Sequence, residues 1–159
     1  MIIYHGSNVE VRDPKIMAGR KALDFGQAFY MTSYYEQAKK WAHLTEQRRI
    51  SGSPIVSEFD FDDNRLSELS VLQFEGADKK WLEFVSACRT NQISDEQCDL
   101  IIGPVANDQT FPTIQLYLLG AYDEDEALRR LLPYKLKNQY AFKTEKSISL
   151  LTFRRVVFV

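Results

Sequence analysis

The pattern of hydrophobic and polar residues along this chain predicts both strands and helices. Short apolar or aromatic runs bounded by turn-forming residues indicate strands, and β-branched residues near the C-terminus indicate a last one. The stretch from Ile55 to Phe61 alternates between two faces, which is typical of a half-buried strand. The expected strands are 2–7, 28–31, 55–61, 99–102, 138–142 and 153–159.

Helical spacing appears between these runs. Ser33 and Glu36 have the spacing of a capping box, and the helix predicted after them places Ala38, Trp41, Ala42 and Thr45 on one face. A second helix, around 78–89, carries an aromatic stripe that is interpreted as core. A third is expected over 110–120 and a short one within 144–150. The acidic run 123–126 is interpreted as the start of a helix rather than as a metal site, because acids there match the helix dipole.

Strands at both ends with helices between them favour an α+β fold over a repeated βαβ unit. The turn-forming segment 51–54 separates the first helix from the next strand. With 159 residues and no internal repeat or linker, the chain is expected to be a single domain, 1–159. A hydrophobic content of 45% indicates a globular protein.

The charge and cysteine content exclude some classes of function. A net charge of −2 gives no support to a general nucleic-acid-binding surface, although it allows a local basic patch. No apolar run approaches the roughly 20 residues needed to span a bilayer, and the first residues lack the pattern of a secretory signal. Cys88 and Cys98 are expected to be buried reduced thiols, and two thiols alone make no zinc site. We therefore expect a cytoplasmic protein with no metal and no membrane partner.

The chemistry is predicted to lie around 19–42. A glycine-containing loop leads into a strand ending in aromatic residues, followed by the first helix. Together these make a concave corner that suits a flat ligand. Upstream, His5 next to Gly6 ends the first strand, where a donor/acceptor side chain lies beside backbone that a ligand can approach closely. A lone histidine is often structural, so the pairing of the two segments carries the argument.

These segments resemble the signature of ADP-ribosyltransferases of the poly(ADP-ribose) polymerase and diphtheria-toxin type. The matching residues are His5-Gly6-Ser7, then Gly26-Gln27-Ala28-Phe29-Tyr30, then Gln37 to Trp41. Together with 99–108, the longer string 24–42 looks closer still to a bacterial family of unknown function with an ADP-ribosyltransferase-like fold. Members of that family are often predicted to act as toxins beside a small antitoxin.

The resemblance implies two small antiparallel sheets around a cleft that binds NAD as co-substrate. It assigns His5 to a ribose hydroxyl, the Gly6 backbone to the nicotinamide carboxamide and Tyr30 to stacking on nicotinamide. The cofactor-binding set it implies is His5, Gly6, Ser7, Arg20, Gly26, Tyr30, Gln37 and Trp41. Trp41 is the candidate for a second stacking wall, with Lys40 as the alternative in that register, and both Tyr30 and Trp41 also suit plain core packing. Arg20 either meets the pyrophosphate or is a solvated surface residue, and the loop 105–108 is expected near the site.

The catalytic set implied by the resemblance is His5, Tyr30 and Gln139. Classical members have a glutamate where this chain has Gln139, in the string Asn138-Gln139-Tyr140-Ala141. An amide bonds a ribose hydroxyl but carries no charge and accepts no proton as a base. This departure disfavours chain elongation. Glu145 lies nearby in sequence as an alternative catalyst, although its position also suits an ordinary first turn of a helix.

Two classes of function therefore compete. The first is a mono-ADP-ribosyltransferase that uses NAD, a toxin acting on a protein or nucleic acid. The second is a nucleotide-binding or interaction module of the same fold with weak or no turnover. Gln139 favours the second class, whereas His5, Tyr30 and the glycine positions favour the first.

Overall fold

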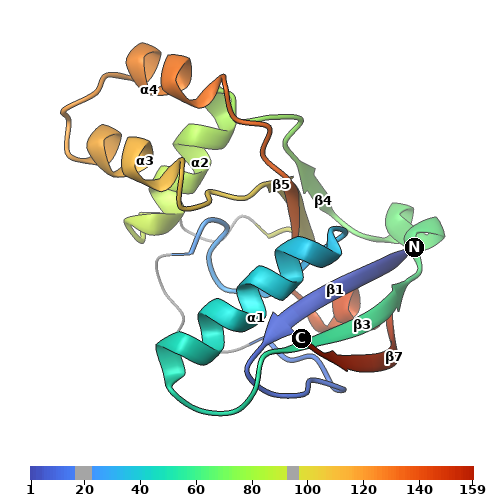
Figure 1. Cartoon of the computed structure of the whole chain (residues 1–159). Helices are drawn as coiled ribbons and strands as arrows, with labels where there is room; N and C mark the ends of the chain where they lie inside the picture. The colour runs from blue at the N-terminus through green and yellow to red at the C-terminus, as the bar shows by residue number, and fades with distance from the viewer. Residues whose placement is uncertain (17–22, 93–96) are drawn as a thin grey trace.

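A computed structural model describes residues 1–16, 23–92 and 97–159, and within these residues the chain is α+β, as expected. Figure 1 shows the arrangement of the helices and strands. In chain order they are β1 (Ile2–Ser7), β2 (Phe29–Thr32), α1 (Tyr35–Arg49), β3 (Ile55–Phe61), the 3-10 helix η1 (Asp63–Glu68), β4 (Val71–Gln73), α2 (Lys79–Arg89), β5 (Leu100–Pro104), α3 (Phe111–Leu118), α4 (Glu124–Leu131), β6 (Asn138–Phe142), α5 (Glu145–Ile148) and β7 (Leu151–Phe158).

The strands form one seven-stranded mixed sheet in the order β4-β5-β6-β2-β1-β3-β7, so the expectation of two small antiparallel sheets is wrong. The physical reason is that β2 pairs on both sides. It pairs with β6 over four residues and with β1 at Tyr4 and Thr32. One short strand therefore joins two groups of strands into a single sheet. The β4–β5 pair is parallel, with α2 in its crossover connection, whereas the other pairs are antiparallel.

The sheet is strongly curved. In a flat sheet, β3 and β6 would lie roughly 14 Å apart, because two strands separate them and each spacing is about 4.8 Å. The rings of Phe61 on β3 and Phe142 on β6 nevertheless have centroids 5.3 Å apart. The two halves of the sheet thus pack against each other through an apolar core that also contains Ile3, Met31 and Phe59.

Helix α1 covers the opposite face of β1 and β3, and Figure 1 shows it lying along β1. Ala38 and Ala42 face Val56 of β3 with no exposed surface. Six of the seven residues of β3, all except Asp60, are buried, so the expectation of a half-buried strand at 55–61 is wrong. The periodicity was right, but a helix covers the face that was expected to meet water.

Helices α2, α3 and α4 form a second layer at the other end of the sheet (Figure 1). Trp81 of α2, the first residue of the expected aromatic stripe, is fully buried in this layer and donates its indole N–H to the Pro104 carbonyl. Asp123 caps α4 by accepting from the Glu126 N–H at 2.8 Å. The acidic run is therefore the start of a helix, as expected.

The start of α1 differs from expectation. The N-cap residue is Tyr34 and no side chain caps it, so the predicted capping box of Ser33 and Glu36 does not form. The hydroxyl of Thr32 instead accepts the Tyr34 N–H at 3.1 Å. The end of β2 thus supplies the oxygen that the sequence pattern assigned to Ser33.

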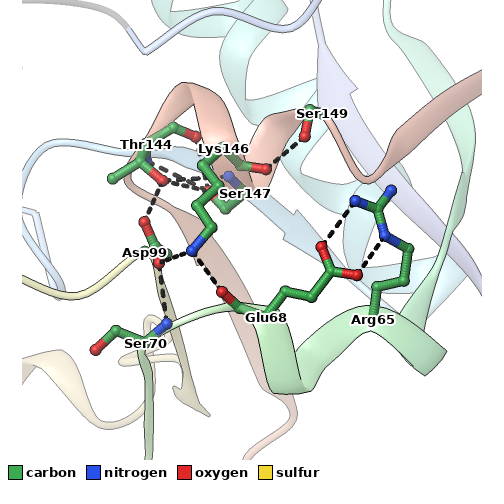
Figure 2. A network of polar contacts seen from close by, with 8 residues as sticks. All are labelled: Arg65, Glu68, Ser70, Asp99, Thr144, Lys146, Ser147 and Ser149. Carbon is green, nitrogen blue, oxygen red and sulfur yellow. Dashed lines mark hydrogen bonds and ion pairs between the residues drawn. The ribbon is translucent and has the colours of Figure 1, made fainter.

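Helix α5 is held by a polar network around Asp99 (Figure 2). The Asp99 carboxylate accepts from the Ser70 N–H at 2.9 Å and from the Thr144 hydroxyl at 2.7 Å, and the Lys146 Nζ lies 3.7 Å away. The Ser70 bond first, then the Thr144 bond and the Lys146 charge, hold the pKa of Asp99 below its usual range. Glu145 therefore begins a short, well-anchored structural helix.

Three further properties can be stated for the described residues. Cys88 and Cys98 are both buried and reduced, as expected. In the described ranges no three His, Cys, Asp or Glu side chains come together as a metal site. None of the helices seen there is both long and apolar enough to cross a membrane.

Candidate functional site

A cavity of about 520 Å³ lies between α1 and the layer of α2 and α3. Its walls come from segments far apart in sequence: β1, the residues before β2, α1, the end of α2, the loop after β5, and β6 with the residues before it. The lining residues are His5, Gly6, Leu23, Asp24, Tyr30, Gln37, Lys40, Trp41, Leu44, Thr45, Arg48, Arg89, Val105, Ala106, Asn107, Asp108, Phe111, Lys135, Lys137 and Gln139.

The floor of the cavity lies where β1 and β2 separate. Beyond the single pair of Tyr4 and Thr32, the His5 imidazole occupies the gap, with its Nδ1 2.8 Å from the Tyr30 carbonyl oxygen and its ring stacked on Phe29 at 4.4 Å. His5 therefore links two strands whose backbones no longer pair there. Gly6 lines the cavity beside it, and on its other side the backbone of α1 fills the space that a side chain would need.

Tyr30 lines the cavity, and its hydroxyl is hydrogen-bonded within the protein. The hydroxyl donates to the Gly26 carbonyl at 2.6 Å and accepts the Phe25 N–H at 3.1 Å. Burial raises the pKa of the Tyr30 phenol far above its usual range. This tyrosine therefore offers a neutral aromatic surface and no titrating group.

Gln139 lines the cavity from β6 and is 3% exposed. Its Nε2 donates to Asp24 Oδ2 at 3.0 Å. A carboxylate only accepts hydrogen bonds, so this contact fixes which end of the amide is nitrogen. Oε1 is consequently the atom of Gln139 that remains to accept a hydrogen bond from a ligand.

Asp24 is the residue that the sequence analysis missed. It is 6% exposed and also accepts the Ala106 N–H at 2.8 Å and two guanidinium N–H groups of Arg89. The Arg89 guanidinium in turn stacks over the Phe111 ring at 4.4 Å. One buried carboxylate thereby joins α2, the loop after β5 and β6 at the cavity wall. The sequence offered no periodic signal for it, because Asp24 lies in an irregular segment beside turn formers.

Helix α1 supplies the facing wall. Gln37 and Trp41 lie one turn apart and both line the cavity, as does Lys40. Lys40 forms an ion pair with Asp108 at 2.9 Å, which connects α1 to the loop after β5. That loop, 105–108, lines the cavity over its whole length, as expected.

The cavity carries more positive than negative side chains. Five are basic, namely Lys40, Arg48, Arg89, Lys135 and Lys137, and two are acidic, namely Asp24 and Asp108. Both carboxylates are paired with cations of the same lining. The remaining positive charge suits an anionic group on a ligand.

The structure brings together six residues of the predicted site: His5, Gly6, Tyr30, Gln37, Trp41 and Gln139. It does not place Ser7 or Gly26 on the lining. Ser7 is buried at the end of β1. Gly26 lies in the turn before β2 with a φ of 71°, and its carbonyl accepts the Tyr30 hydroxyl. Glu145 is also absent from the lining, and Arg20 lies outside the described residues.

Comparison with known proteins is informative at the level of family. A family model described as "Protein of unknown function (DUF3990)" matches residues 1–153. No curated protein and no solved structure matches the chain significantly. Because the family model covers nearly the whole sequence, this protein belongs to the DUF3990 family.

Proposed function

We propose that this protein is an NAD-dependent mono-ADP-ribosyltransferase with an ADP-ribosyltransferase-like fold. One observation carries the proposal. His5, Tyr30 and Gln139, the three motif residues of the resemblance, come from β1, β2 and β6 and line the same cavity. We further propose that the protein is a cytoplasmic bacterial toxin that modifies a protein or nucleic acid and is held in check by a small antitoxin.

Transfer of ADP-ribose breaks the bond between nicotinamide and ribose, and positive charge develops on the ribose as the bond breaks. A site for this chemistry must hold the ring flat, fix the ribose and stabilise that charge. The Tyr30 ring and the facing Trp41 supply aromatic surface, and Gln139 Oε1 supplies an acceptor for a ribose hydroxyl. A neutral, buried Tyr30 adds no competing charge.

Asp24 provides a negative charge next to the amide. Its carboxylate touches Gln139 Nε2 and is partly neutralised by Arg89. We therefore assign the role of the classical glutamate to a pair, with Gln139 orienting the ribose and Asp24 polarising the amide. An ion-paired carboxylate stabilises developing positive charge less than a free one, so we expect slow, single transfer and no chain elongation.

The excess basic side chains suit the pyrophosphate of NAD. Arg89 and Gln139 both form hydrogen bonds with Asp24, which connects them. Lys135 and Lys137 precede β6 and also line the cavity. A guanidinium that gives two N–H groups to Asp24 still has three further donors for a phosphate oxygen. These residues take the role that the sequence analysis gave to Arg20.

A binding module without turnover is the second candidate, and the neutral amide of Gln139 favours it. Such a module retains the cavity, the aromatic walls and the positive charge, and binds a nucleotide without breaking it. NAD binding alone is therefore expected from both candidates. Transfer of labelled ADP-ribose from NAD to an acceptor is expected only from the enzyme and therefore distinguishes the two candidates.

The test incubates labelled NAD and cell lysate with the wild type, Gln139→Ala, Gln139→Glu and Glu145→Gln, and then treats samples separately with protease and nuclease. We expect labelled product with the wild type and at least a tenfold loss in Gln139→Ala, with NAD affinity falling only modestly. Gln139→Glu is expected to raise NAD hydrolysis, because a carboxylate also activates water.

Glu145→Gln is the matched control, since Glu145 is an exposed residue of α5 outside the cavity lining. It should keep full activity. Full activity in Gln139→Ala, or loss in Glu145→Gln, would contradict the assignment. NAD binding without any transfer by the wild type would establish the binding module instead.

A further inference from the structure

Gln37 carries two polar atoms that the fold leaves without partners. Both Nε2 and Oε1 are buried and make no hydrogen bond within the described part of the chain. Burying an unpaired amide is unfavourable, so a folded protein retains such a residue at a cost in stability. Because Gln37 is also a lining residue of the cavity, a ligand bound there is expected to supply the missing partners.

The other unpaired polar atoms of the described residues differ from this one. Ser86 has one unpaired atom, its Oγ. Asn8 also has one, its Oδ1, whereas its Nδ2 donates to the Ser51 carbonyl at 3.0 Å. Neither residue lines the cavity. Among the described residues, therefore, only Gln37 joins an unpaired donor, an unpaired acceptor and a place on the cavity wall.

A glutamine amide presents its donor and acceptor side by side in one plane. It is complementary to an edge that carries an acceptor and a donor in the same arrangement, such as the edge of adenine or a carboxamide. Trp41 lies one helical turn further along the same wall and offers an aromatic face to a planar ring. Gln37 is half-buried as a residue, whereas both of its amide atoms are buried, so a ligand reaches them when the side chain turns toward the cavity.

We propose that Gln37 is the specificity-determining residue of the cavity. Its amide binds, through two hydrogen bonds, a neutral and planar ligand group that carries one donor and one acceptor side by side. The ligand is either a nicotinamide-type carboxamide or an adenine base. This inference rests on the proposed nucleotide site but not on turnover. Charge cannot be the basis of this ligand preference. The lining has more basic than acidic side chains and would by charge alone favour a carboxylate over an amide.

Calorimetric titration of the full chain tests this with two pairs of probes. Nicotinamide is compared with nicotinic acid, which has lost the donor, and adenosine with purine riboside, which lacks the exocyclic amine. We expect the wild type to bind the edge-bearing member of one pair roughly tenfold to a hundredfold more tightly than its analogue. The pair that shows the preference identifies the ligand group.

Gln37→Met should abolish this preference and leave the affinity for purine riboside or nicotinic acid unchanged. Its melting temperature should not fall below that of the wild type, because the substitution removes an unpaired buried amide. Gln37→Glu, which keeps acceptors and loses the donor, provides a second variant and should also lose the preference. Gln47→Met, at an exposed position of the same helix outside the lining, is the matched control and should behave as wild type.

Three results would overturn the inference: no preference within either pair for the wild type, a preserved preference in Gln37→Met, or an equal loss for both members of a pair with a lower melting temperature. The last result would reveal a purely structural role. Transfer of label from NAD without dependence of binding on Gln37 would refute this inference and leave the proposed function intact. Binding that depends on Gln37 without transfer would refute only the enzymatic proposal.

Discussion

At the scale of single residues, the chemistry of the cavity depends on which polar atoms of its lining are already hydrogen-bonded within the protein. The Tyr30 hydroxyl and one end of the Gln139 amide are bonded within the chain, whereas the Tyr30 ring and Gln139 Oε1 remain for a ligand. The resemblance of the sequence to ADP-ribosyltransferases named both residues as candidates. It did not show which of their atoms are free, because this follows from the position of Asp24 and of the turn before β2.

The buried hydroxyl of Tyr30 gives the first prediction at this scale. Because burial raises its pKa, folded protein keeps the phenolic proton at a pH where the unfolded chain releases it. The free energy of unfolding should therefore be unaffected below about pH 10, the usual tyrosine pKa, and fall as pH rises above it. Tyr30→Phe should lose this part of the pH dependence and also about 1–3 kcal/mol of stability, since the Gly26 carbonyl and the Phe25 N–H lose their partner.

Phenolate absorbance checks the prediction directly. Folded wild type and folded Tyr30→Phe should give the same absorbance up to roughly pH 11, whereas in denaturant the wild type should show one additional titrating tyrosine. Ionisation of Tyr30 near pH 10 in the folded protein would show that the hydroxyl is not buried as described.

At the scale of elements, the wall of the cavity depends on how closely α1 approaches β1. A Cβ at Gly6 would lie 1.9 Å from the Ala38 carbonyl oxygen and 2.8 Å from the Ala42 N atom. The small residues of both elements thus allow helix and strand to pack backbone against backbone. This contact sets the position of Gln37 and Trp41 relative to His5.

Gly6→Ala should therefore be strongly destabilising, by about 3 kcal/mol or more, because backbone of α1 cannot yield as a flexible side chain does. It should also weaken ligand binding through displacement of α1. Denaturant titration measures the stability, with Gly76→Ala as the control. Gly76 has open space around the position of an added Cβ, so that variant should be nearly neutral. Equal stability of the two variants would mean that α1 does not pack on Gly6.

At the scale of the whole molecule, the two groups of strands are joined in two ways. Strand β2 joins them through the backbone, by pairing with β6 on one side and β1 on the other. Asp24 reinforces this junction through side chains, because it precedes β2 and bonds to Arg89, Gln139 and the Ala106 N–H. The cavity is located at this junction.

Removal of the Asp24 charge should accordingly affect stability and site together. Asp24→Asn leaves Arg89, whose side chain is 18% exposed, without a charge partner, and breaking such a buried pair costs about 3–5 kcal/mol. Denaturant titration should show this loss. Asp60→Asn breaks the Asp60–Arg154 ion pair on the surface, where the carboxylate is 52% exposed, and should cost about 0–1 kcal/mol.

The same Asp24→Asn variant should bind NAD more weakly even where it remains folded, because one amide oxygen cannot hold both Arg89 and Gln139 as the two carboxylate oxygens do. Unchanged stability and unchanged NAD affinity would show that the junction does not depend on this carboxylate.

Local pattern determined the elements of this protein. The strands 2–7, 55–61 and 138–142 have the bounds expected from the sequence, and the aromatic stripe of α2 is buried as expected. These features follow from the periodicity of apolar residues, which any short segment expresses on its own. The resemblance to ADP-ribosyltransferase motifs, rather than periodicity, supplied His5, Tyr30 and Gln139 as candidate site residues.

Long-range packing determined the rest. That the strands form one curved sheet depends on β2 pairing on both sides, and no local pattern encodes how many partners a strand has. The burial of six of the seven residues of β3 depends on where α1 packs, and the importance of Asp24 depends on donors from 65 to 115 residues away in sequence. Sequence periodicity reports which face of an element is apolar, whereas the pairing of charges and the position of a cavity arise only when distant segments meet.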